Sequence, residues 1–233
     1  MIIRSIINGD YESAIIEAFV LALIILFINP IHEYAHALTA FKLGDNTPKL
    51  QGRLTLNPLA SLDLYGALLF VLVGFGWAKP VQINSVNFKC KQKTGIVLTA
   101  AAGPLSNLIF AFISALLLAA ITKLFPTDSG AVSYIRLAFT LLVQMNVLLA
   151  VFNLIPLPPL DGSRIAAGVL PERIYFKLFK YERIIQYALF GIMIAAVILS
   201  RIGIDIFAPL QTFTNWIAQG IIKLAFIIFG YKV

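Results

Sequence analysis

Residues 14–36 of this 233-residue chain read AIIEAFVLALIILFINPIHEYAH. The run from Ala14 to Ile31 has a single charged side chain, Glu17, and its length approaches the roughly 20 apolar residues that an α-helix needs to cross a bilayer. Two histidines, His32 and His36, follow directly and lie four positions apart. The stretch therefore predicts a membrane helix that carries polar chemistry near one end.

The composition of the whole chain supports a membrane protein. Hydrophobic residues make up 60% and charged residues 12%, about half of the roughly 25% charged residues in an ordinary soluble domain. A soluble or disordered chain and a free nucleic-acid binder are therefore excluded. The net charge of +7 is typical of lysines and arginines that flank membrane spans on the cytoplasmic side, and the single cysteine excludes an intrachain disulfide.

Further hydrophobic segments predict an all-α polytopic membrane protein with about five transmembrane helices. We also expect a short sixth hydrophobic element over 64–78, and short membrane-associated strands near 50–56 and 79–88, where polar and apolar residues alternate weakly. The four later spans are 95–122, 131–154, 184–200 and 206–229. We interpret residues 1–233 as one membrane-embedded domain, with a catalytic core over about 12–170 and C-terminal helices over 184–230.

The segment 64–78 has 15 residues, which is short for a crossing. If it dips into the bilayer and returns, 13 lysines and arginines lie on one side and 3 on the other, whereas a crossing gives 11 and 5. Arg136 and Lys223 lie inside predicted spans and are left out of both counts. Positive residues gather on the cytoplasmic side, so the sharper split favours a re-entrant element. The topology then places the C-terminus and the end of the His32 helix on the cytoplasmic side.

The pentapeptide HEYAH, residues 32–36, fits the pattern H-E-x-x-H. On a helix, His32 and His36 share a face and both can bind one zinc ion, while Glu33 can accept a proton from a zinc-activated water. Two histidines and a glutamate in an apolar helix are costly and indicate function. The alternative is a polar cluster that pairs with another helix.

One zinc ion needs a third protein ligand, and the chain has no third histidine. Five aspartates are candidates: Asp45, Asp63, Asp128, Asp161 and Asp205. The re-entrant topology places Asp161 on the same side as the histidines, within PLPPLDG, where prolines break the helix and Gly162 permits a close turn. Asp63 is the second choice, and Asp161 has the alternative role of capping the following helix.

These motifs resemble the site-2 protease family of intramembrane zinc metalloproteases. The resemblance rests on HEYAH, AAGPLSN (101–107) and NLIPLPPLDG (153–162), in that order, while GRLTLNPLA (52–60) and GFGWAKPV (74–81) resemble a small subgroup without PDZ or CBS domains. It implies zinc binding by His32, His36 and Asp161, and Glu33 as the catalytic base. Relatives often have histidine where this chain has Ser61.

The resemblance implies an enzyme that hydrolyses peptide bonds in or near transmembrane segments of other membrane proteins. Asn107 and Asn153 are candidate substrate-binding residues, although Asn107 could equally bond a neighbouring helix. We expect an integral protein of a prokaryotic cell membrane, with the lipid bilayer and a membrane protein as partners, no nucleic acid, and an active site toward the cytoplasm. The alternatives are a metal-ion transporter and a non-catalytic membrane scaffold.

Overall fold

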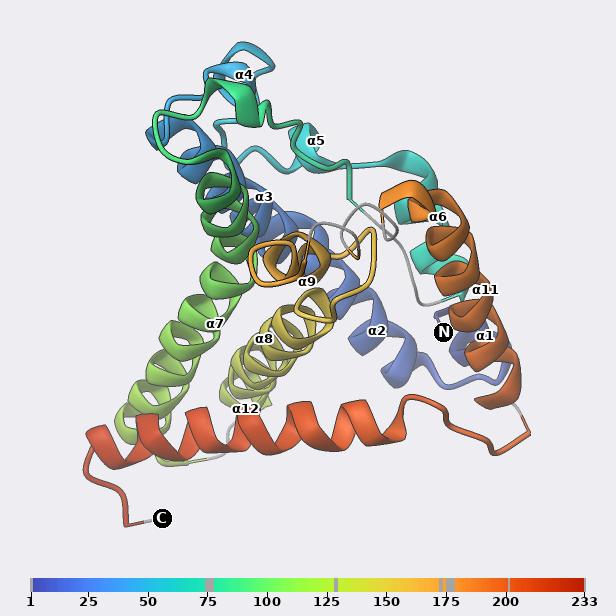
Figure 1. Ribbon diagram of the computed structural model, residues 1–233. Helices are drawn as coiled ribbons and strands as arrows, with labels where there is room; N and C mark the ends of the chain where they lie inside the picture. The colour runs from blue at the N-terminus through green and yellow to red at the C-terminus, as the bar shows by residue number, and fades with distance from the viewer. Residues whose placement is uncertain are drawn as a thin grey trace. The chain divides into compact units, whose positions relative to one another are not determined.

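The computed structural model describes residues 2–73, 78–127, 130–171, 174, 179–200 and 202–232 (Figure 1). Every regular element within these residues is a helix. The chain divides into two compact units. The first comprises Met1–Pro104 and Asn153–Ile206, and the second comprises Leu105–Phe152 and Phe207–Val233.

The long N-terminal helical run belongs to the first unit. After the short α1 (Ile2–Ile7), α2 (Tyr11–Leu23) passes into a π-helical stretch, η1 (Ile24–Ile28), and then into α3 (Asn29–Lys42). Gly44, with φ of +112°, follows immediately, a conformation that side-chain-bearing residues rarely adopt. The predicted helix end near Leu43 is therefore confirmed.

Short helices and extended segments occupy the region between α3 and the next long helix. These are α4 (Thr47–Leu50), α5 (Pro58–Ser61), α6 (Leu64–Val73) and the 3₁₀ turn η2 (Ser85–Asn87). The strands predicted near 50–56 and 79–88 do not form: both segments are fully described and neither contains a strand. In 79–88, single side chains rather than a strand ladder bind the amides of Val81 and Asn84. In 50–56, local backbone bonds close the end of α4 and the following turn, such as that from Arg53 N–H to the Pro48 carbonyl.

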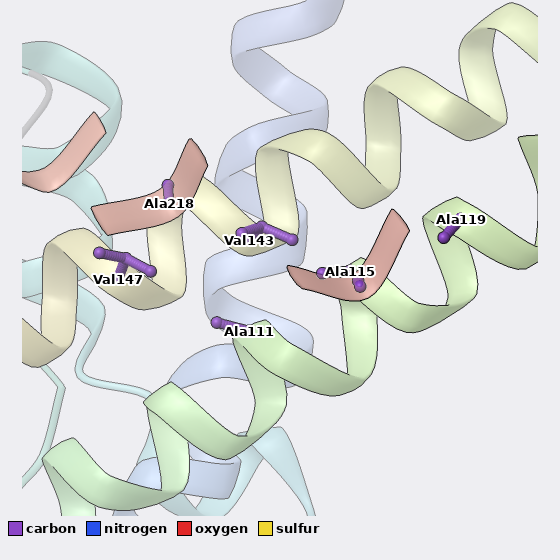
Figure 2. Packing of buried hydrophobic residues seen from close by; sticks show 7 residues of the cluster. Ala111, Ala115, Ala119, Val143, Val147 and Ala218 are labelled. Carbon is purple, nitrogen blue, oxygen red and sulfur yellow. The ribbon is translucent and has the colours of Figure 1, made fainter. Parts of the chain in front are cut away.

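The later helices that the structure describes are long except for one. They are α7 (Gln92–Leu124), α8 (Gly130–Asn153), the short α9 (Asp161–Ala166), α11 (Glu182–Ser200) and α12 (Ala208–Ile228). In the second unit, small residues of α7 pack against α8 and α12, and Figure 2 shows Ala218 beside Val143 and Val147. Alanines at these contacts allow helices to approach closely, as is usual in membrane proteins.

Within the described part of the chain, four helical runs are long and apolar enough to cross a membrane: Ala14–Lys42, Gln92–Leu124, Gly130–Asn153 and Glu182–Ser200. They match four of the five predicted spans. The fifth, 206–229, forms a helix, but it is not among the four, because residues such as Gln211, Asn215 and Lys223 lower its hydropathy.

The short hydrophobic element over 64–78 is helical as far as Val73, and residues 74–77 lie outside the described part of the chain. The ten residues of α6 extend about 15 Å, half of the hydrocarbon core. That length is compatible with a re-entrant element, which stays a prediction.

Asp45 joins the end of α3 to the segment that precedes α7. Its side chain is fully buried and accepts hydrogen bonds from Thr47 N and Oγ1 at 3.0 and 2.6 Å, from Asn84 N at 2.7 Å and from Asn87 Nδ2 at 3.0 Å. Burial favours the neutral form, but the hydrogen bonds from Thr47, Asn87 and Asn84 outweigh it and hold the pKa of Asp45 below its usual value. Asp45 is therefore a structural carboxylate.

We predict that Asp45→Ala lowers the free energy of unfolding by about 1–3 kcal/mol at pH 7, because buried donors lose their acceptor. The pKa of Asp45 is lower in the folded state, so its contribution is present above about pH 4 and is lost as the pH falls further. Unfolding of wild type and Asp45→Ala in detergent measures the difference between their free energies of unfolding, which should be smaller at pH 3 than at pH 7. Asn46→Ala is the control, since this exposed neighbour makes no side-chain capping bond. Equal stability of Asp45→Ala and wild type at pH 7 would contradict the role.

Candidate metal centre

Three side chains from two distant parts of the sequence converge on one point in the first unit. His32 and His36 come from α3, and Asp161 is the first residue of α9 (Figure 1). The Nε2 atoms of the two histidines are 3.0 Å apart, and Asp161 Oδ2 lies 3.2 Å from His32 Nε2 and 3.3 Å from His36 Nε2. The three atoms form a nearly equilateral triangle.

The triangle has the dimensions of one face of a zinc coordination sphere. Zinc binds imidazole nitrogen and carboxylate oxygen at about 2.0–2.2 Å with tetrahedral geometry, which separates neighbouring ligand atoms by about 3.3 Å. Among the described residues, this is the group of histidine, cysteine and acidic side chains placed to hold a metal ion. Two imidazoles and one carboxylate also leave a fourth position, as catalytic zinc sites require.

The backbone of α7 orients one of the two imidazoles. His36 Nδ1 lies 2.7 Å from the carbonyl oxygen of Thr99, so a proton on Nδ1 is donated to that carbonyl. Nε2 is then the unprotonated nitrogen, whose lone pair can bind a metal. A ligand histidine bonded through its other nitrogen in this way has a fixed tautomer and ring orientation.

Two glycines make the close approach of these elements possible. A Cβ atom added to Gly103 of α7 would lie 2.3 Å from His36 Nε2 and 2.6 Å from His32 Cε1, inside the site itself. A Cβ atom on Gly162 would lie 2.2 Å from the carbonyl oxygen of Leu154. The donor set and the space kept free by Gly103 both fit a zinc ion.

Asp161 is in the form that binds metals. Burial favours its neutral form, but the nearby His36 and His32 outweigh burial and hold the pKa of Asp161 well below its usual range. The alternative role as a helix cap is not observed, since Leu160 occupies the N-cap position and Asp161 lies inside α9.

Glu33 lies beside the triangle on α3 and has its own partners. Its Oε2 accepts a hydrogen bond from the backbone N–H of Val81 at 3.0 Å and lies 3.9 Å from Nη2 of Arg53. Both partners belong to the segments in which strands were predicted. Sequence reasoning missed Arg53 and Val81, and also Thr99, whose contribution is a backbone carbonyl that no residue pattern reveals.

The other candidate ligands have different roles or positions. Asp63 Oδ1 accepts the N–H of Gly66 at 2.8 Å at the start of α6, and Asp45 is bonded as described above. Asp205 is exposed, and Asp128 lies outside the described residues. The structure therefore brings Asp161, and none of the other described aspartates, to the histidine pair.

The two asparagines proposed for substrate binding are found in different units. Asn153 ends α8 and is partly buried in the first unit. Asn107 belongs to the second unit, where its side chain is fully buried and neither amide atom has a hydrogen-bond partner among the described residues. Their role in substrate binding stays a prediction.

Comparison with known proteins finds similarity to a peptidase family and to proteins named as zinc metalloproteases. The family model described as Peptidase family M50 matches residues 119–198. The chain is 41% identical over 177 residues to the protein named "Putative zinc metalloprotease YwhC" from Bacillus subtilis, covering 74% of this chain and 78% of the relative.

More distant relatives carry a similar name. The chain is 35% identical over 138 residues to proteins named "Putative zinc metalloprotease Rip2" from Mycolicibacterium smegmatis and Mycobacterium tuberculosis. That match covers 57% of this chain and half of the relative's length. No solved structure matches the chain.

We predict that Gly103→Ala removes most of the bound zinc, because the added methyl group would occupy the space between the two imidazoles. Metal analysis of the purified variant measures the loss. Gly191→Ala is the matched control: this glycine lies in α11, where an added Cβ meets no atom within 4 Å, so the zinc content should equal that of wild type. A full zinc complement in Gly103→Ala would show that the imidazoles do not meet at this point.

Proposed function

The chain belongs to peptidase family M50, the site-2 protease family, and is a zinc metalloprotease; from this premise we propose that it hydrolyses peptide bonds in or near transmembrane segments of membrane proteins. Support comes from the place of the candidate site. His32 and His36 lie within Ala14–Lys42, one of the four runs long and apolar enough to cross a membrane. A protease whose centre lies on such a helix is suited to substrates held in the same bilayer.

His32, His36 and Asp161 hold the single zinc ion in this proposal. The observation that carries it is the triangle of ligand atoms, with sides of 3.0, 3.2 and 3.3 Å. Zinc bound there would polarise the scissile carbonyl and lower the pKa of a water molecule. Asp161 and the two neutral imidazoles supply one negative charge, so the site keeps a net positive charge that favours an electron-rich carbonyl oxygen.

Glu33 is the general base. It is adjacent to His32 in the sequence, and its carboxylate is held by Val81 N–H and Arg53 rather than by either histidine. Glu33 takes a proton from the attacking water and then donates it to the nitrogen of the departing amine, so one carboxylate serves both halves of the hydrolysis. Asn153, at the end of α8, is proposed to bind the substrate backbone.

The site residues all fall within the proposed catalytic core over about 12–170. We place the active site toward the cytoplasmic side of a prokaryotic cell membrane, as the distribution of positive residues indicates. A helical substrate must unwind before its scissile bond can reach the site, because helical hydrogen bonds and side chains shield the backbone. The extended, exposed residues near Gln82 offer a surface for such an unwound segment.

We predict that Glu33→Gln retains zinc and loses cleavage, because the amide keeps the shape of the side chain and cannot accept the proton. The assay compares wild type and variant in proteoliposomes, with a transmembrane-helix substrate and with a water-soluble peptide of the same cleavage sequence. Cleavage should require the membrane substrate and fall by about 100-fold or more in Glu33→Gln. Full cleavage by this variant would contradict the base assignment, and equal cleavage of both substrates by wild type would contradict the intramembrane proposal.

We predict that Asp161→Asn weakens zinc binding by roughly tenfold or more, because the site loses its only anionic ligand. Asp63→Asn is the matched control, since Asn keeps an oxygen that can accept the Gly66 N–H. Titration of both variants with a zinc chelator of known affinity gives the two dissociation constants. An unchanged constant in Asp161→Asn would assign the third ligand elsewhere.

A further inference from the structure

Arg53 is a buried cation that is not one of the candidate metal ligands. Only 8% of the residue is exposed, and the backbone N–H of Arg53 is bonded to the carbonyl of Pro48 at 2.8 Å. A buried guanidinium needs a counter-charge and hydrogen-bond acceptors to offset its lost hydration. Among the described residues, the carboxylate within ion-pair distance is that of Glu33, with Arg53 Nη2 at 3.9 Å from Glu33 Oε2.

The same guanidinium fixes two further stretches of chain. Nη1 donates to the carbonyl oxygen of Ala60 in α5, and Nη2 donates to the carbonyl oxygen of Lys79. These two stretches are also bonded to each other, since Lys79 N–H donates to the Ser61 carbonyl at 2.9 Å. Arg53 therefore lies where α5 and the segment beginning at Lys79 meet.

Residues 79–82, here called the strap, reach Glu33 directly. Val81 N–H donates to Glu33 Oε2 at 3.0 Å, two residues after the carbonyl that Arg53 binds. Pro80 lies between them, and its ring restricts the backbone at that point. Arg53 thus acts on Glu33 in two ways. Its guanidinium faces the carboxylate directly, and it also binds the strap, whose Val81 N–H donates to the same carboxylate.

We propose that Arg53 is a positioning residue for the general base, holding the Glu33 carboxylate in place both by its charge and through the strap. The proposal rests on the proposed role of Glu33. At 3.9 Å the guanidinium is too far from Oε2 for a hydrogen bond. Arg53 therefore restrains the carboxylate without donating a hydrogen bond to the lone pairs of Oε2, one of which can accept the proton.

The geometry requires arginine in particular. The planar guanidinium can bond two carbonyls and face a carboxylate at the same time, whereas the ammonium of lysine is a single point charge. Lysine at position 53 would keep the charge near Glu33 and lose at least one of the two carbonyl bonds. Arg53→Lys should accordingly retain part, and not all, of the wild-type turnover.

A cleft of about 340 Å³ gives access to this arrangement. It is lined by Gln51, Arg53, Lys79, Pro80 and Gln82, and the Gln51 and Gln82 side chains are hydrogen-bonded to each other at 3.0 Å. The volume exceeds that of a small cation such as methylguanidinium. An added cation can therefore reach the place left empty when the Arg53 side chain is removed.

The experiment measures kcat, KM and zinc content of the Arg53→Ala, Arg53→Lys and Lys49→Ala variants in proteoliposomes. Lys49→Ala is the charge-matched control, because Lys49 is an exposed cation on the neighbouring α4 and makes no contact with Glu33. We expect Arg53→Ala to keep its zinc and to lose about 10- to 100-fold in kcat, with a much smaller change in KM. Methylguanidinium should restore part of that kcat, and an equal concentration of methylammonium should restore less.

Each result decides between distinct conclusions. Wild-type kcat in Arg53→Ala, or a loss confined to KM, would overturn the positioning role while leaving Glu33 as base. Loss of zinc or of a cooperative unfolding transition in Arg53→Ala would make Arg53 a general structural residue and would also overturn it. Full cleavage by Glu33→Gln would instead remove the premise, so failure of the proposed function is recognised separately.

Discussion

The contact of Asp161 with the His32–His36 pair is the interaction on which the first unit depends. Polar side chains in an apolar helix carry a large desolvation cost unless they are paired or bind a metal. Here the cost is offset at one point, where a carboxylate from α9 meets two imidazoles from α3 at 3.2 and 3.3 Å. The helix α7 lies close to the same point, and its Thr99 carbonyl accepts a hydrogen bond from His36 Nδ1.

The parts of the candidate site that the sequence predicted depend on local spacing and on the distribution of charge. His32 and His36 are linked by helical periodicity, which is local, and Asp161 was selected by topology and by the proline-rich segment before it. The end of α3 was predictable because glycine commonly follows the last turn of a helix, and Gly44 indeed adopts a positive φ there. The end of α3 and the three candidate ligands were therefore predictable from short-range chemistry and from the distribution of charged residues, both of which are visible in one sequence.

The parts that were missed depend on contacts between distant segments. Alternation near 50–56 and 79–88 predicted strands, but the first segment begins with the end of α4 and a turn that local backbone bonds close. In the second segment, backbone groups are bonded to the side chains of Asp45, Glu33 and Arg53 instead of to a partner strand. No local pattern shows that Arg53 will lie beside Glu33. The helix over 206–229 was assigned as a span from its apolar residues, although its amides and Lys223 reduce its hydropathy below that of the four spans.

The π-helical stretch Ile24–Ile28 has a consequence for how the helix that carries His32 and His36 can change in evolution. A π-turn is closed by an i→i+5 hydrogen bond and holds one residue more than an α-turn, so it absorbs one extra residue within a continuous helical run. Deleting one residue there would restore α-helical winding with little rotation of α2 relative to His32 and His36, whereas a deletion in a regular α-helical stretch would rotate α2 by about 100°. The stretch Ile24–Ile28 is therefore a place where the length of the chain can change by one residue while the two histidines keep their orientation relative to α2.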